Sequence, residues 1–159
     1  MAIKSRRIGE QVESNTLGRI RVLNDSGASI KAGDILSVMG TNASAGFLRV
    51  AIADANGAVA LASGMKLVAS HDIANGSTGI AVSWKIVTKV DTTAFASGAA
   101  GIVGQELYLS NAGTSGNTVD TASGAGAVYT KVVGQVLTLS SGAGKADGVI
   151  LLSPLKWHQ

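Results

Sequence analysis

Few residues of this chain have the type and spacing needed for catalysis. His71 stands beside Asp72, which is two thirds of a hydrolytic triad, but no Gly-x-Ser-x-Gly turn supplies the third member. We therefore interpret His71 as an exposed loop residue. The sequence Gly-Ala-Gly-Lys ending at Lys145 resembles part of a phosphate-binding loop. It lacks both the earlier glycine and the Ser or Thr after the lysine that such a loop requires, so it predicts a hairpin tip.

Metal and cofactor sites are not indicated either. The chain has no Cys and only two His, and its acidic residues beyond position 31 stand singly instead of at ligand spacing. Sugar sites often present aromatic platforms, but only 4% of the residues are aromatic. We expect no catalytic residue, no metal and no cofactor, and we expect that the protein is not an enzyme.

Composition and charge limit the remaining classes. The 159 residues suffice for one domain, and only 14% are charged against about 25% in a typical soluble domain. The net charge of +3 resides entirely in residues 1–31, which hold six bases and three acids, while the rest is balanced. A nucleic-acid domain usually carries a basic stripe across its fold. No apolar stretch reaches the length of about 18 residues needed for a membrane helix. We expect neither specific nucleic-acid binding nor a membrane partner.

The elements that position these residues are predicted to be short strands. Polar and apolar residues alternate over 17–23, and further strand patterns cover 35–39, 47–53, 65–70, 105–110, 128–139 and 148–153. Over residues 78–90, Ile80, Val82, Trp84 and Ile86 share one face, which predicts one long strand with Trp84 in the core. No window shows a helical stripe. We expect nine to eleven strands in an all-β fold, a small antiparallel β-barrel or β-sandwich with an extended N-terminal arm.

The sequence divides into three segments and contains one internal repeat. We expect an arm over residues 1–16, a body over 17–153 and a tail over 154–159. The arm either attaches to an acidic surface or is a solvated terminus. Trp157 in the tail either anchors a neighbouring subunit or folds back on its own barrel. Residues 103–110 match residues 133–140 at six of eight positions, which predicts two similar hairpins in one barrel.

An ordered series of short sequence motifs resembles the head decoration, or cement, proteins of tailed bacteriophages. These motifs combine strands with Gly-Asp turns and small residues, and the likeness covers residues 17–153. They are residues 32–36 (AGDIL), 50–55 (VAIADA), 104–110 (GQELYLS), 133–137 (VGQVL) and 148–152 (GVILL).

The resemblance implies a structural protein on the outer surface of the virion. Such proteins form trimers at threefold positions and hold major capsid protein subunits together, often through an extended terminal arm. It therefore implies a homotrimer bound to the major capsid protein. A Gly/Ser/Thr-rich stretch at residues 113–126 departs from the shortest members of the family. The residues expected to contact the capsid or a neighbouring subunit are Lys4, Arg6, Arg7, Ile8, Arg19, Arg21 and Trp157.

Two other classes remain open. A tail-fibre, tail or adhesin-like domain also tolerates Gly/Ser/Thr-rich strands and trimerises. Such domains usually show longer sequence repetition than the single repeat of residues 103–110 and 133–140. An enzyme or small-ligand barrel would need a deep pocket with clustered polar groups.

Overall fold

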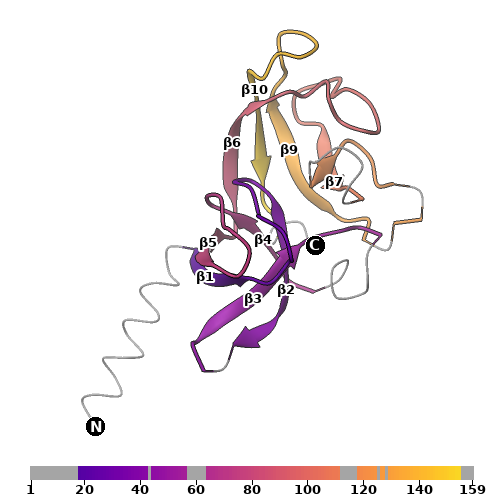
Figure 1. Ribbon diagram of the computed structural model, residues 1–159. Coiled ribbons are helices and arrows are strands. Elements are labelled where there is room, and N and C mark those ends of the chain that lie inside the picture. The colour runs from indigo at the N-terminus through magenta and orange to yellow at the C-terminus, as the bar shows by residue number, and fades with distance from the viewer. Residues whose placement is uncertain are drawn as a thin grey trace.

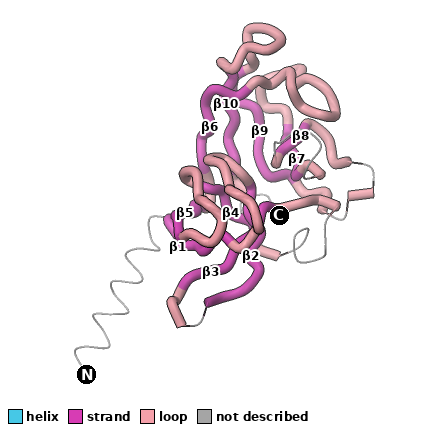
Figure 2. The backbone as a smooth tube through the Cα atoms, viewed as in Figure 1, coloured by secondary structure: helices cyan, strands magenta, loops and turns pink. Residues whose placement is uncertain are grey.

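The computed structural model describes residues 18–42, 44–56, 64–111, 118–124, 126–127 and 129–154, and it places ten strands within them (Figure 1). The predicted all-β class and strand number are confirmed. Figure 2 shows strands joined by loops and turns throughout the described chain. Within the described residues, no helix is long and apolar enough to cross a membrane. The strands divide into a closed barrel and an open sheet.

The barrel is built from the N-terminal strands. They are β1 (Arg19–Asn24), β2 (Ile35–Asn42), β3 (Phe47–Ile52), β4 (Lys66–Ala69) and β5 (Thr78–Val82). Their order is β1-β3-β2-β4-β5, and antiparallel pairing of β1 with β5 closes the ring. The pairing of β1 with β3 is parallel, whereas the other barrel pairs are antiparallel.

The barrel interior is narrow and favours small side chains on β5. A Cβ atom on Gly79 would lie 2.6 Å from the side chain of Ile73, so only glycine fits there. Ala81, two residues on, is fully buried. The interior cluster consists of Val22, Ile30, Leu36, Val50, Leu67, Ala69, Ile73 and Ala81.

The open sheet contains the C-terminal strands in the order β6-β10-β9-β7-β8. They are β6 (Lys85–Val90), β7 (Glu106–Leu109), β8 (Val119–Asp120), β9 (Val132–Thr138) and β10 (Gly148–Leu152). Its inner face packs on the barrel wall, because one buried cluster joins Leu107, Val136 and Ile150 of the sheet to Ile35 and Val68 of the barrel. The sheet and the barrel wall therefore share one core.

The internal repeat of residues 103–110 and 133–140 corresponds to two adjacent strands. β7 and β9 pair antiparallel, with Leu107 opposite Gly134, and each is the first strand of a hairpin, β7–β8 and β9–β10. The prediction of two similar hairpins is confirmed, but both lie in the open sheet instead of the barrel. Gly134 permits close packing there, since a Cβ on it would lie 2.3 Å from the Leu151 carbonyl oxygen.

The prediction of one long strand over residues 78–90 is wrong. β5 belongs to the barrel and β6 to the sheet, with Ser83 and Trp84 between them. Because each half faces a different core, one alternating face does not hold over the segment: Ala81 is buried, and Val82, Val87 and Val90 pack against the core. Trp84 was expected in the core and is instead 55% exposed.

Candidate interaction surface

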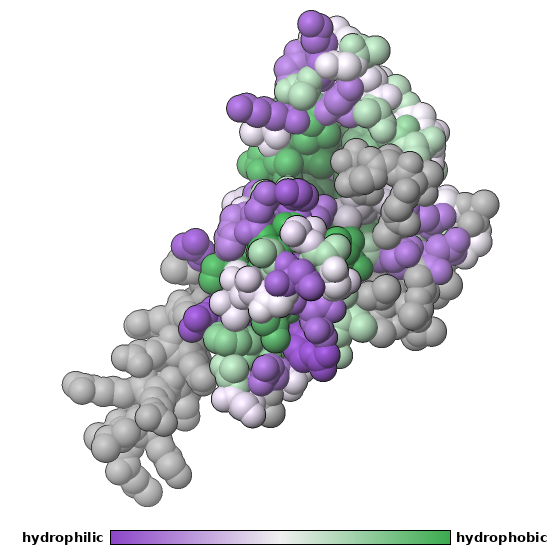
Figure 3. All heavy atoms as spheres, in the orientation of Figure 1, coloured by the Kyte–Doolittle hydropathy of each residue, from purple (hydrophilic) through white to green (hydrophobic). Residues whose placement is uncertain are grey.

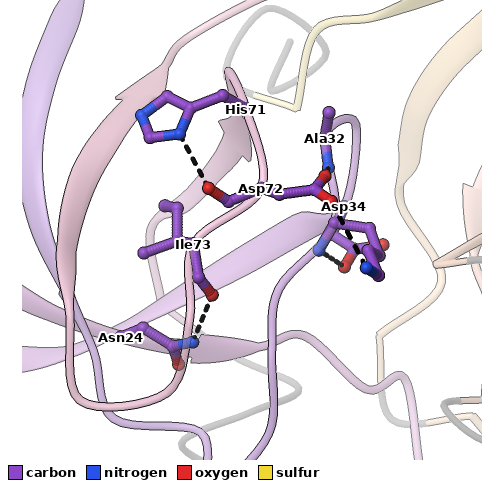
Figure 4. A network of polar contacts seen from close by, with 7 residues as sticks. Asn24, Ala32, Asp34, His71, Asp72 and Ile73 are labelled. Atoms are coloured by element: carbon purple, nitrogen blue, oxygen red, sulfur yellow. Dashed lines mark hydrogen bonds and ion pairs between the residues drawn. The ribbon is translucent and has the colours of Figure 1, made fainter.

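The His–Asp pair belongs to a network that joins two loops at one end of the barrel (Figure 4). The Nε2 atom of His71 accepts a hydrogen bond from the Ile80 N–H at 3.2 Å, so the proton lies on Nδ1, which donates to the Asp72 carbonyl oxygen at 2.8 Å. The His71 ring therefore bonds the backbone of Asp72 and not its carboxylate. The interpretation of His71 as an exposed loop residue is confirmed.

The carboxylates of this network hold the loop before β2. Asp72 accepts the Ala32 N–H at 2.8 Å and pairs with the Lys31 ammonium at 3.3 Å, and these contacts lower the pKa of Asp72. Asp34 accepts the Lys31 N–H at 2.7 Å, but burial dominates and raises its pKa. Gly33 has φ of 91°, which the tight Gly-Asp turn requires.

A buried amide completes the same network. The Nδ2 atom of Asn24 donates to the carbonyl oxygens of Ala28 and Ile73 at 2.8 and 2.9 Å. Its Oδ1 atom accepts the Ser26 N–H at 3.0 Å. These contacts fasten the loops together, and each polar group is occupied by the fold. Among the described residues, no group of three His, Cys, Asp or Glu side chains is placed to hold a metal ion.

Two of the seven predicted contact residues fall within the described chain, and both lie exposed on β1. The guanidinium of Arg21 lies over the Phe47 ring, 4.6 Å from its centroid. Parallel pairing of β1 with β3 brings Arg21 and Phe47 together. Arg49, which like Phe47 lies on β3, forms an ion pair with Asp25. Lys4, Arg6, Arg7, Ile8 and Trp157 lie outside the described residues.

A groove of about 290 Å³ lies where the barrel meets the open sheet. It begins at Gly18 and Arg19, next to residues 1–17 in the sequence, and ends at Trp84, directly before β6, and at Ile86 of β6. Its lining consists of Gly18, Arg19, Ser70, Val82, Trp84, Lys85 and Ile86. The exposed fractions of Trp84 and Ile86 are 55% and 51%. Exposed apolar side chains that lie together in one patch are typical of interaction sites.

Lys85 fixes the wall of the groove. Its ammonium donates to the carbonyl oxygens of Ser70 at 2.6 Å and Ala69 at 3.2 Å, at the end of β4. Partial burial lowers the pKa of Lys85. The contacts tie β6 to the barrel and hold Trp84 and Ile86 on either side of an anchored residue. The groove is therefore a preformed surface.

The apolar surface continues from β6 onto β10. Ile86 pairs with Leu151, and Val149 and Leu151 are half-buried between the buried Ile150 and Leu152. Figure 3 shows hydrophobic residues gathered over β6 and β10 on the face in view. Sequence reasoning missed this surface, because it assigned Trp84 and Ile86 to the core.

No family model, no curated protein and no solved structure matches this chain.

Proposed function

We propose that the chain is a structural virion protein that decorates a bacteriophage capsid, binding across major capsid protein subunits as a homotrimer and stabilising the shell. One observation carries the proposal: exposed cationic and apolar side chains meet in a preformed groove at the point where the N-terminal segment joins the fold. Arg19, Trp84 and Ile86 supply them. A homotrimeric structural protein needs an interaction surface of this kind for the contact between its copies as well as one toward the shell.

The resemblance to cement proteins supports the same assignment. The Gly-Asp motif, Gly33-Asp34, lies in a turn directly before β2. In this turn the Asp34 N–H donates to the Lys31 carbonyl oxygen at 3.0 Å. Of the two Gly-Gln motifs, Gly104-Gln105 lies directly before β7 and Gly134-Gln135 lies on β9, and these two strands pair. We expect the N-terminal segment to add to a strand edge of the capsid protein and the arginines to pair with its acids.

Arg21 is the described residue best placed for the shell. Stacking on Phe47 orients its guanidinium, while the fold leaves it exposed. Arg49 differs, because its guanidinium already pairs with Asp25. On this reasoning Arg21 contributes to shell binding, together with Lys4, Arg6 and Arg7 of the arm.

The test uses shells of the major capsid protein from the same genome. Deletion of residues 1–16 and the single change Arg21→Glu are compared with Lys145→Glu, a charge reversal on the exposed β9–β10 hairpin tip. Cosedimentation measures occupancy, and circular dichroism verifies the fold. We expect both arm-side variants to stay folded and to bind less, and Lys145→Glu to bind normally.

Two results would contradict the proposal. Unchanged occupancy after the deletion would remove the arm from shell binding. Absence of any binding by the intact chain, combined with an elongated trimer in solution, would favour the tail-fibre alternative.

A further inference from the structure

The open sheet carries a second exposed apolar feature, on the side opposite to the groove. The loop at residues 101–104 precedes β7 and presents Ile102 and Val103, with exposed fractions of 67% and 61%. β6 and β7 lie on opposite sides of the sheet, separated by β10 and β9 (Figure 1). One chain thus has an apolar groove at one edge and an aliphatic tip near the other.

The tip is held in one conformation. The Gly104 N–H donates to the Val136 carbonyl oxygen of β9 at 2.7 Å, and the Gly101 N–H donates to Gln105 Oε1 at 2.7 Å. Gly104 has φ of 86°, a conformation that disfavours other residues. Two large aliphatic side chains are therefore presented to solvent on an ordered turn, which lowers the entropic cost of docking them.

The groove offers an apolar surface to such side chains. Its apolar part is formed by Val82, Trp84 and Ile86. β6 is also an edge strand. Lys89, with φ of 61°, interrupts the regular strand conformation toward its far end, so that the accessible edge is limited to the part next to the groove.

The groove and the tip also carry opposite charges. Arg19 lines the groove and makes no ion pair with another described residue. Glu106 lies two residues after the tip, is exposed, and accepts one hydrogen bond from the Tyr108 hydroxyl at 2.9 Å. A cation at the groove and an anion beside the tip are expected to attract each other across an interface and to set its register.

We propose that a second copy of this chain is the occupant of the groove, and that its Ile102 and Val103 insert beside Trp84 and Ile86 while its Glu106 pairs with Arg19. Since the two surfaces differ, the contact is heterologous, which is the type that forms a ring when its rotation closes. The inference deepens the proposed homotrimer by naming its contact. It also assigns Arg19 to the contact between copies and leaves Arg21 to the shell.

Disulfide trapping tests the geometry directly, because the chain contains no cysteine. Ile86→Cys and Val103→Cys are made as separate proteins. After mild oxidation we expect a covalent dimer when the two are mixed and almost none from either alone. A chain that carries both changes is expected to yield a closed covalent ring. Ile86→Cys mixed with Lys145→Cys serves as the control, since the hairpin tip is exposed but lies outside the proposed contact.

Three outcomes would overturn the inference. They are a mixture that does not cross-link, single variants that cross-link to themselves as strongly as the mixture, and a chain that light scattering finds monomeric at micromolar concentration. The first result also covers a groove filled by residues 1–17 or 155–159 of the same chain.

A charge exchange tests the pairing without cysteines. Arg19→Glu and Glu106→Arg are each expected to weaken association by about tenfold, and the doubly changed chain is expected to recover it. Loss without recovery would refute the Arg19–Glu106 contact. Each assay is run in solution without shells, so a failed contact between copies is distinguishable from failed shell binding.

Discussion

A buried lysine is expected to make the free energy of unfolding rise with pH in the alkaline range. Lys66 on β4 is only 1% exposed; its ammonium lies 4.9 Å from the centroid of the Tyr129 ring and 3.4 Å from the Gly64 carbonyl oxygen. Burial lowers the pKa of Lys66 from 10.5 to about 8. The protonated amine is thus better accommodated in the unfolded chain than in the folded one.

The sign and size of the effect follow from linkage. Between pH 8 and 10.5 the unfolded chain binds more protons than the folded chain, so the free energy of unfolding rises with pH across this window. Keeping Lys66 buried costs about 3 kcal/mol at pH 7, and most of this cost, about 2 kcal/mol, disappears by pH 10.

The assay is urea unfolding of the wild type and of Lys66→Met at pH 7 and pH 10. Methionine keeps the unbranched apolar stem without the amine. We expect the wild type to gain about 2 kcal/mol relative to the variant between the two pH values. Lys145→Met, at an exposed position, controls for general alkaline effects and is expected to show no relative change. An equal difference between wild type and Lys66→Met at both pH values would refute the reasoning.

Three further predictions concern packing and the loop network. Gly134→Ala is expected to cost about 1–3 kcal/mol in chemical unfolding, because its Cβ meets the Leu151 carbonyl oxygen, whereas Gly142→Ala, whose Cβ would make only an ordinary contact with Lys145 at 4.0 Å, is expected to change stability by less than about 0.5 kcal/mol. Asn24→Ala is expected to cost about 1–3 kcal/mol in the same assay, because it removes the buried side-chain amide that donates to the Ala28 and Ile73 carbonyl oxygens; an unchanged midpoint would contradict this. The lowered pKa of Asp72 means that its stabilising contribution is present above the unfolded pKa near 4 and is lost as pH falls; Asp72→Asn is expected to flatten the acid limb of the stability profile, and an unaltered limb would count against it.

Alternation predicted most strands of the fold, because a strand with one buried face leaves a direct record in the sequence. The Ile35 and Phe47 strands begin where the pattern places them. β8 was missed, since two residues carry no period. Trp84 was misplaced because alternation cannot show that a chain leaves one core and enters another. The tip residues Ile102 and Val103 had a signal, two aliphatic residues between glycines, which predicts an exposed turn.

The candidate surface was harder to predict than the fold. Arg19 was identified from the local excess of positive charge, but its position beside Trp84 depends on pairing between distant segments. Exposure of an apolar residue is a property of tertiary packing, so a pattern that assumes burial assigns it to the core. Conversely, the absence of a clustered reactive motif directed attention to surfaces from the outset.

The division of strands along the chain has a consequence for synthesis. All five barrel strands lie between Arg19 and Val82, so the ring can close before the open sheet has left the ribosome. Translation at about 5–20 residues per second leaves the barrel wall around Ile35 and Val68 without its cover for several seconds. During that interval the nascent chain exposes an apolar surface that the finished protein hides, and we expect a holding chaperone to bind there before β6 to β10 arrive.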